Sequence, residues 1–212
     1  MSEVTIKLPE NIEEITLEQY QRFDKLTKRT DLDDLSFNKR LIEIFTDLKY
    51  RDIGNISHKD YKDILGYITT ALGQDAPFVN RFELGGVEFG FIPNLDDMST
   101  AEFVDLSKWG VEVENFNRIM SVLFRPVLKN DRYDNYEIES YNGTEKYNVL
   151  MKQMPMNIVN GALGFFYHLA KELRIHTLRY TSQVQAREAE HLDTLTSGVG
   201  TSQSVHSLAK MS

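Results

Sequence analysis

An apolar helical pattern runs without a break from Pro155 to about Glu190, and this long segment limits the possible folds more than any other feature. At 1.5 Å per residue, a helix of roughly 35 residues is about 50 Å long. A small domain is only about 30 Å wide. We therefore expect the first half of the helix to lie in the core and the second half, from about Arg174, to project from the body. The apolar positions of the first half are Ile158, Val159, Ala162, Leu163, Phe165, Phe166, Tyr167, Leu169 and Leu173.

Three shorter helical patterns lie closer to the N-terminus, and each begins near a residue type that caps helices. Thr16 and Gln19 match a capping box, in which each side chain accepts a hydrogen bond from the backbone amide of the other residue. Ser36 and Ser57 are expected to cap the next two helices, and residues 4–8 alternate in character as a short strand does. The predicted helices cover about 17–28, 37–49 and 58–72.

Between residues 81 and 92 the apolar period changes from 3.6 to 2, which is typical of strands. Gly85 and Gly86 stand between two alternating segments. Two glycines form a tight hairpin turn because both adopt positive φ without strain. The sequence therefore predicts a β-hairpin at about 81–92. Its alternating apolar residues are Phe82, Leu84, Val87, Phe89 and Phe91.

The chain between this hairpin and the long helix is expected to be mostly helical. Ser99 and Glu102 form a second capping-box pattern. Pro126 should end a helix, the polar residues 129–137 are expected to form a loop, and a short strand is expected within 136–141. The fold class is therefore α+β and predominantly helical. The predicted helices of this part cover about 100–109, 113–124 and 145–153.

The pattern divides the chain into three parts. Residues 1–173 are expected to form a mainly helical domain that contains the hairpin. Residues 174–191 form the projecting end of the long C-terminal helix, and residues 192–212 form a flexible polar tail. The tail is rich in Ser, Thr and Gly and has too few apolar residues to fold alone.

The composition excludes several classes of protein. Hydrophobic residues make up 41% and charged residues 26% of the 212 residues, as in soluble globular proteins. The formal net charge of −8 argues against a surface for nucleic-acid phosphates or anionic lipid. The absence of cysteine excludes disulfides and Cys-ligated metals. The N-terminus does not resemble a signal peptide, and no run reaches the roughly 18 apolar residues of a membrane helix. We expect a soluble cytosolic protein that binds neither nucleic acid nor membrane.

No motif predicts a catalytic, cofactor-binding or metal-binding site. His168, Glu172 and His176 follow one another at four-residue steps, but the two histidines lie about 12 Å apart along a helix axis, and no further ligand pattern accompanies them. Asp96 and Asp97 lie in a polar turn, where carboxylates favour the start of a helix and lack the burial that acid–base pairs need. The glycine-rich segments lack the ending of a phosphate loop. A small enzyme with an unrecognised site remains the remote alternative.

Residues 83–114 carry most of the negative charge. This segment contains eight acids and one base, Lys108, and its net charge of −7 compares with −8 for the whole chain. Such a block is most often a solvated face. The alternative is a docking surface that orients a basic partner and accelerates its binding. The candidate partner-binding residues of this surface are Asp96, Asp97, Glu102 and Asp105.

Two groups of residues at the start of the long helix indicate close packing. Met151, Met154 and Met156 are expected to fill gaps in the core, although flexible thioethers also suit adaptable binding surfaces. Gly161 and Gly164 each cost about 1 kcal/mol relative to alanine inside a helix. We interpret them as positions where another part of the structure approaches closely.

A series of short motifs carries a resemblance to a known family. Together the motifs cover about residues 4–173, and it is their joint order that is characteristic. They are LPE at 8–10, ITLEQY at 15–20, the hairpin 82–91 with IPNL at 92–95, STAEFVDL at 99–106, MSVLFRPV at 120–127, and MPM at 154–156 leading into GALGFF at 161–166. In this order they resemble the tail- or baseplate-assembly proteins of tailed bacteriophages.

The resemblance implies a non-enzymatic protein that binds other proteins during virion assembly, in the manner of an assembly chaperone. Its expected partners are other phage structural or tail proteins, or copies of itself, in the cytoplasm of the host bacterium. The projecting helix would present Leu178, Tyr180 and Val184 to a groove of the partner. The alternative is a permanent structural component that is retained in the virion and ordered by neighbouring subunits.

Overall fold

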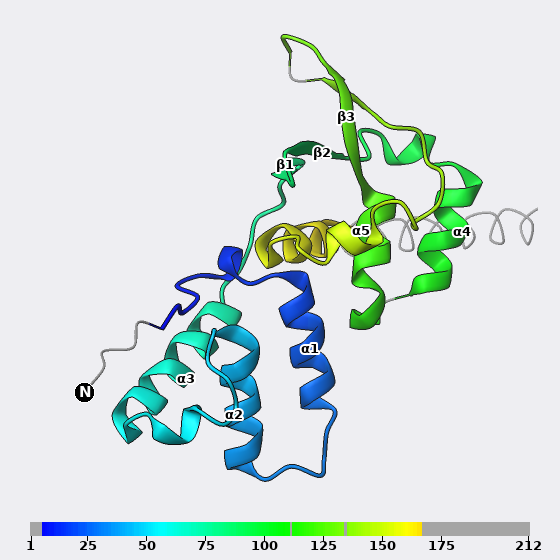
Figure 1. The fold of residues 1–212 in the computed structure, drawn as a ribbon. Helices are drawn as coiled ribbons and strands as arrows, with labels where there is room; N and C mark the ends of the chain where they lie inside the picture. The colour runs from blue at the N-terminus through cyan, green and yellow to red at the C-terminus, as the bar shows by residue number, and fades with distance from the viewer. Residues whose placement is uncertain (1–5, 111, 134, 167–212) are drawn as a thin grey trace, which may run out of the picture. The chain divides into compact units, whose positions relative to one another are not determined.

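The computed structural model describes residues 6–110, 112–133 and 135–166. Its N-terminal part is a group of three helices that lie next to one another in chain order (Figure 1). They are α1 (Leu17–Thr27), α2 (Asp34–Phe45) and α3 (His58–Leu72). The helices predicted at 17–28 and 58–72 are confirmed.

Side chains at the starts of these helices accept hydrogen bonds from amides that have no partner inside the helix. Thr16 Oγ1 accepts a hydrogen bond from the Gln19 amide at 3.2 Å, and Gln19 Oε1 accepts one from the Thr16 amide at 2.9 Å. The predicted capping box is therefore confirmed. Ser57 caps α3 as predicted, because its Oγ accepts a hydrogen bond from the Asp60 amide at 3.1 Å.

The predicted bounds of α2 are wrong at both ends. The helix begins at Asp34 because Asp33, and not Ser36, is the capping residue: Asp33 Oδ1 accepts a hydrogen bond from the Ser36 amide at 2.9 Å. The helix ends at Phe45, since Thr46 has an extended backbone with φ −128° and ψ 177°. Ser36, which lies three residues after the true cap, was mistaken for the cap.

Four strands pair in the order β1-β2-β3-β4, and each neighbouring pair is antiparallel. The predicted hairpin is confirmed, with Gly85 and Gly86 at φ 60° and 76° in its turn. Residues 6–8, the described part of the strand predicted at 4–8, are not in a strand. The strands are β1 (Arg81–Leu84), β2 (Val87–Phe91), β3 (Phe124–Asn130) and β4 (Tyr136–Ile138).

The strand β3 was not predicted. The chain continues from a helix directly into this strand, and Pro126 lies inside it. Pro126 stands opposite Phe89 of β2, and its carbonyl accepts a hydrogen bond from the Glu139 amide at 2.9 Å. Proline lacks an N–H, so a strand tolerates it where no donor is needed. The loop predicted at 129–137 is correspondingly shorter, and the strand expected within 136–141 is present as β4.

The remaining helices differ from the predictions mainly in where they begin. The helix predicted at 100–109 has those bounds, whereas a 3-10 turn at Val113–Asn115 precedes α5. α6 is shorter than the predicted 145–153, and the long helix is described from Met156 to Phe166. The named helices of this part are α4 (Thr100–Trp109), α5 (Phe116–Leu123) and α6 (Asn148–Met151).

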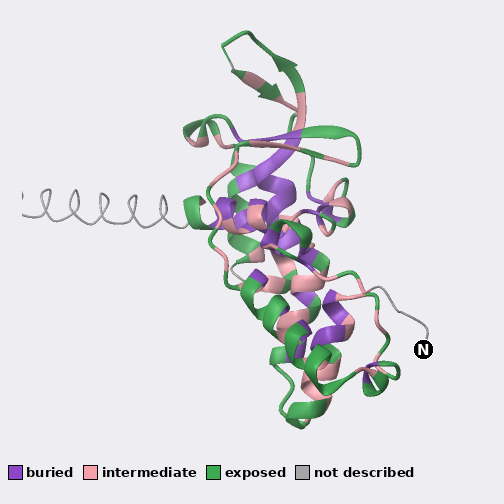
Figure 2. Ribbon diagram, turned by 90° about the vertical axis from the view of Figure 1, so that its left-hand side faces the viewer, coloured by how far each residue is buried: buried purple, intermediate pink, exposed green. Residues whose placement is uncertain are grey.

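The methionine cluster and the start of the long helix lie in the core. Met151, Met154 and Met156 have no exposed surface, so their predicted role as core residues is confirmed. Buried residues also concentrate on α5 and at the start of β3, whereas the far end of β3 is exposed (Figure 2). The buried apolar positions of the long helix are Ile158, Val159, Ala162 and Leu163.

The two glycines of the long helix have different surroundings. A Cβ added at Gly161 would lie 2.3 Å from the carbonyl oxygen of Pro77, so the helix approaches the backbone before β1 as closely as it can. The predicted close approach is confirmed at this position. Gly164 has no heavy atom within 4 Å of such a Cβ. Beyond it, Phe165 stacks on Phe78 with ring centroids 4.4 Å apart.

Backbone hydrogen bonds join the segment before α1 to the start of the long helix. The Leu17 amide donates to the Met154 carbonyl at 2.9 Å, and the Met156 amide donates to the Ile15 carbonyl at 2.8 Å. These bonds tie the N-terminal helices to the methionine cluster, although nearly 140 residues separate the two segments in sequence.

The α+β, predominantly helical fold class is confirmed. The described residues up to Phe165 form one unit by their contacts. The predicted projecting helix at 174–191 and tail at 192–212 lie outside the described residues and stay predictions, as does the boundary at 173. Within the described part, no helix is both long enough and apolar enough to cross a membrane.

Candidate functional site

Helix α4 has an unusual distribution of side chains, because it buries an acid and exposes its large apolar residues. Glu102 and Leu106 face inward, with exposed fractions of 4% and 9%. Phe103 and Val104 face solvent, with exposed fractions of 64% and 54%. Amphipathic surface helices normally show the opposite pattern. The inward side of α4 therefore combines a charged residue with an apolar one, while two large apolar residues stay exposed.

Glu102 is held in place from two directions. At the start of α4 it completes the predicted capping box: its Oε2 accepts a hydrogen bond from the Ser99 amide at 2.6 Å, and its own amide donates to Ser99 Oγ at 3.3 Å. Its other oxygen, Oε1, forms an ion pair with Nη1 of Arg125 at the start of β3. Arg125 Nη1 also donates to the Val122 carbonyl at 3.1 Å. The pair joins α4 to the sheet.

The two charges of this pair are almost completely removed from water, with side-chain exposures of 6% for Glu102 and 9% for Arg125. Burial acts to raise the pKa of the Glu102 carboxyl, but the hydrogen bonds from Ser99 and the interaction with Arg125 outweigh it and lower the pKa. Glu102 is therefore ionised at neutral pH. A buried pair of this kind is costly to break, since the remaining charge would have no partner.

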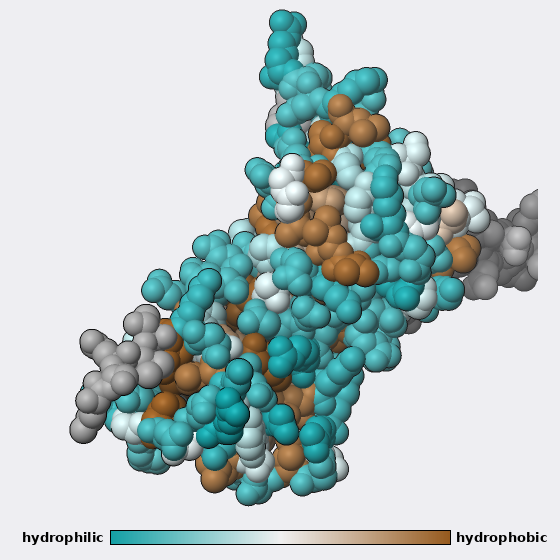
Figure 3. Space-filling model, in the orientation of Figure 1, coloured by the Kyte–Doolittle hydropathy of each residue, from teal (hydrophilic) through white to brown (hydrophobic). Residues whose placement is uncertain are grey.

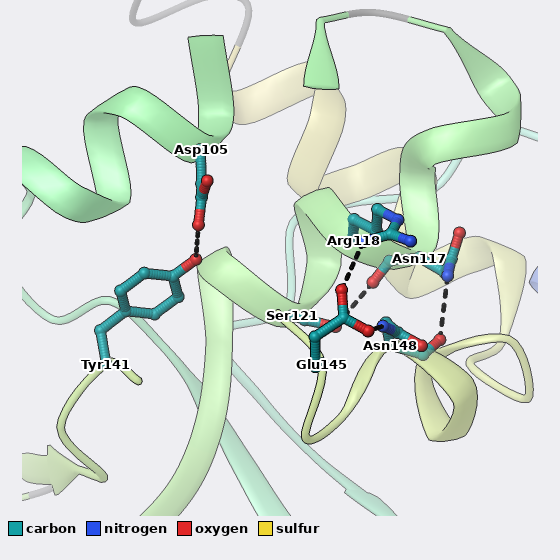
Figure 4. A network of polar contacts seen from close by, with 7 residues as sticks. All are labelled: Asp105, Asn117, Arg118, Ser121, Tyr141, Glu145 and Asn148. Carbon is teal, nitrogen blue, oxygen red and sulfur yellow. Dashed lines mark hydrogen bonds and ion pairs between the residues drawn. The ribbon is translucent and has the colours of Figure 1, made fainter. Parts of the chain in front are cut away.

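A second contact fixes the same helix from the segment that follows β4. The Tyr141 hydroxyl donates a hydrogen bond to Asp105 Oδ2, as the close view shows (Figure 4). The Arg125 guanidinium lies over the Tyr141 ring, 5.5 Å from its centroid. Burial, together with the bond to Asp105, raises the pKa of the Tyr141 hydroxyl, so the tyrosine stays a neutral donor. α4 is thus held by both of its predicted docking acids, Glu102 and Asp105.

The four acids predicted to bind a partner therefore separate into two pairs. Asp96 and Asp97 lie exposed in the 3-10 turn Leu95–Asp97 just before α4, as a docking surface requires. Asp105 is partly buried and already accepts a hydrogen bond. Glu102 is buried in an ion pair, so its assignment to an exposed surface is wrong. The sequence pattern missed this because the partner of Glu102 is 23 residues away in the chain.

The sequence analysis did not single out Phe103 and Val104, which are the largest apolar residues exposed on α4. We call Asp96, Asp97, Phe103 and Val104 the α4 surface. The face drawn in Figure 3 is mostly hydrophilic and is interrupted by apolar patches, so exposed apolar groups are the exception on this face. The sequence contains a pattern that could have predicted their exposure. Two apolar residues directly follow the acid of a capping box, and this spacing places them on a different side of the helix from that acid.

A second polar network lies beneath α5 and has a structural role. Asn117 of α5 accepts a hydrogen bond from the side-chain amide of Gln21 in α1 at 3.0 Å. It also donates to the Asn148 carbonyl of α6 at 3.0 Å (Figure 4). Ser121 Oγ donates to the Asn117 carbonyl at 2.7 Å, and Asn148 donates to Glu145 at 3.0 Å. Buried amides that are satisfied in this way fix the register of three helices.

The histidines and acids of the described residues do not form a metal site. No group of three or more His, Asp or Glu in this part is arranged to hold a metal ion. His58, the histidine within the described ranges, lies at the start of α3, where its ring stacks on that of Tyr61. The candidate ligands His168, Glu172 and His176 lie outside the described residues. The predicted partner-binding residues outside the same ranges are Leu178, Tyr180 and Val184.

Comparisons with models of protein families, with curated proteins and with solved structures gave no match to this chain. The resemblance to phage assembly proteins therefore depends on the sequence motifs alone. The structural feature of the described residues that bears on function is the α4 surface.

Proposed function

We propose that this protein is a non-enzymatic protein-binding module and that the α4 surface is one of its contact sites. One observation carries the proposal: Phe103 and Val104 are exposed side by side on a helix whose orientation is fixed by a buried ion pair. Contact sites of this kind need apolar groups that are held in position before the partner arrives.

The chemistry of the α4 surface indicates the kind of partner. Covering an exposed phenylalanine or valine side chain stabilises a complex by about 1.5–3 kcal/mol each. Asp96 and Asp97 at the start of the helix are exposed and carry negative charge. Acids at the edge of an apolar site contribute orientation and association rate more than affinity. The proposed partner surface therefore has an apolar recess with basic residues beside it.

The biological setting that we propose is virion morphogenesis of a tailed bacteriophage. The support is the ordered set of motifs over residues 4–173, four of which coincide with structured positions: the capping boxes before α1 and α4, the hairpin, and the close approach at Gly161. Within this setting, we propose first that the protein acts in the host cytoplasm as a chaperone-like factor in tail or baseplate assembly. The alternative proposal is that it is a structural component retained permanently in the virion.

Quantitative mass spectrometry of purified particles and of infected-cell lysate tests this setting. An assembly factor is expected to be abundant in the lysate and nearly absent from particles, because it leaves before completion. A fixed number of copies per particle would identify a structural subunit. If the protein is found in neither sample, the phage proposal is wrong.

Replacing Phe103 with aspartate is expected to weaken partner binding roughly tenfold or more, because it removes about 1.5–3 kcal/mol of apolar burial. The fold should be unaffected, since Phe103 is 64% exposed. Tyr67→Asp is the matched control, because Tyr67 is an exposed aromatic residue on α3 with an exposed fraction of 57%. Binding is measured by titration against the purified partner, with circular dichroism for the fold. Equal losses in both variants would contradict a specific role for α4.

Deleting residues 175–212 is expected to leave a folded, soluble domain that binds its partner less tightly. The described core ends before this segment, and the proposal places a further contact at Leu178, Tyr180 and Val184. Thermal unfolding and partner titration of the truncated chain are the measurements. Loss of cooperative unfolding would mean that the distal helix belongs to the core.

A further inference from the structure

Four cations and one acid, Glu43, line a groove between α1 and α2, in a chain whose net charge is −8. The groove has a volume of about 350 Å³. We call it the α1–α2 groove. Its cations are Arg22, Lys25, Arg29 and Arg40.

Two of these cations lie on one side of α1, because Arg22 and Lys25 are spaced i and i+3 within Leu17–Thr27. Arg29 lies two residues beyond the end of that helix, and Arg40 belongs to α2. The groove therefore takes its positive charge from both helices and from the segment after α1, and a ligand that matches it carries more than one negative charge.

Two of the four cations already have partners, and two do not. Arg29 pairs with Asp31, with Nη2 and Oδ2 2.5 Å apart, and Arg40 pairs with Glu43 at 3.1 Å. Arg22 and Lys25 are exposed and form no ion pair with any described residue. These two side chains are the free positive charges of the groove.

The groove also has an apolar floor, made by Leu26 of α1 and Ile44 of α2. This combination of a recessed apolar floor and flanking cations is the complement of the α4 surface, where Phe103 and Val104 are exposed on the helix and the exposed Asp96 and Asp97 lie in the turn just before it. Both surfaces belong to the same chain. A second copy therefore offers each groove the matching charges and an apolar group to cover its floor.

We propose that the α1–α2 groove binds the α4 surface of a second copy of this chain. The inference rests on the proposed function, because it takes the α4 surface to be a contact site and names its occupant. Two different patches meet in this contact, so it is heterologous. The contact is small and depends on exposed charges, which predicts weak association that decreases as salt is added.

A charge exchange tests the proposal with the full-length protein. The double variant Arg22→Glu with Lys25→Glu reverses the free charges of the groove, and Asp96→Lys with Asp97→Lys reverses the α4 surface. Each double variant alone is expected to self-associate roughly tenfold to a hundredfold more weakly than the wild type. An equimolar mixture of the two is expected to associate again, since every contact then joins opposite charges. Sedimentation velocity at low and high salt is the measurement.

The matched control is Lys59→Glu with Lys62→Glu on α3. These two lysines are exposed, have the same i, i+3 spacing as Arg22 and Lys25, and undergo the same change in charge. This control is expected to self-associate as the wild type does. A control that loses association as fully as the groove variant would overturn the proposal, because net charge alone would then explain both results.

Three other outcomes overturn the inference and leave the proposed function standing. The first is a wild-type chain that is monomeric at low salt and high concentration. The second is a mixture of the reversed variants that stays monomeric. The third is a labelled DNA duplex that binds the wild type and not the groove variant, which would assign the groove to nucleic acid. Failure of the proposed function itself is distinguishable, because it appears as unchanged partner binding by Phe103→Asp.

Discussion

Replacing Arg125 with methionine is expected to lower the free energy of unfolding by about 3–5 kcal/mol, because it leaves the buried Glu102 carboxylate without its cation. The side chains of the pair are only 9% and 6% exposed, so water does not replace the lost partner. The matched control is Lys129→Met on the same strand. Lys129 pairs with Glu137 at 3.0 Å, but both side chains are mostly exposed, at 76% and 67%. Its loss should cost about 1 kcal/mol or less.

Urea unfolding followed by circular dichroism measures both effects. A second change, Glu102→Gln in the Arg125→Met background, should restore part of the stability, because a neutral amide replaces the unpaired carboxylate and still accepts the capping hydrogen bond. If Arg125→Met costs no more than Lys129→Met, the pair does not hold α4, and the rigid placement of Phe103 loses its physical basis.

The same pair gives stability a defined dependence on pH. The pKa of Glu102 is lower in the folded state than its usual value of 4.5, so the folded state binds fewer protons than the unfolded state in the interval between the two values. The contribution of Glu102 is therefore present above about pH 4.5 and is lost as the pH falls through the lowered pKa. In Arg125→Met this gain on raising the pH should be smaller.

Replacing Gly161 with alanine is expected to cost about 2–3 kcal/mol of unfolding free energy. The added Cβ would lie 2.3 Å from the Pro77 carbonyl oxygen and 3.0 Å from the Cα of Phe78, and a backbone cannot move aside as a flexible side chain does. The helix would have to shift from the segment before β1, which carries the stacked Phe78 ring. Thermal unfolding measures the loss.

The matched control is Gly66→Ala in α3. Gly66 is also inside a helix, but it is exposed and no heavy atom lies within 4 Å of an added Cβ. Alanine there should raise the unfolding free energy by about 0.5–1 kcal/mol, through its higher helix propensity. A neutral or stabilising result for Gly161→Ala would show that the helix and Pro77 are not in close contact.

Features whose cause is local in sequence were predicted well. The capping boxes at Thr16 and Ser99 each depend on residues three apart, and the hairpin depends on two adjacent glycines between alternating apolar residues. In each case the interacting groups are close in the chain, so their spacing alone determines the geometry.

Features that depend on distant partners were predicted poorly. Pro126 was expected to end a helix, and α5 does end at Leu123, but the strand β3 that contains Pro126 was not predicted because it depends on pairing with β2 and with the segment after β4. The start of α2 was misplaced for a local reason, since Asp33 and Ser36 both suit a helix start and only the three-dimensional structure identifies the residue that accepts the hydrogen bond.

The sequence by itself determined the helix-rich α+β class, the hairpin, two capping boxes and an acidic segment around α4, since each follows from composition or from contacts between near neighbours. Only the tertiary structure decided which acids of that segment face solvent. Arg125 draws Glu102 into the interior across 23 residues, and the rotation of α4 that this pairing requires leaves Phe103 and Val104 exposed. A buried charge without a partner is costly, so the ion pair, together with the buried Leu106 one turn later, keeps this face inward and leaves the other face available to a partner.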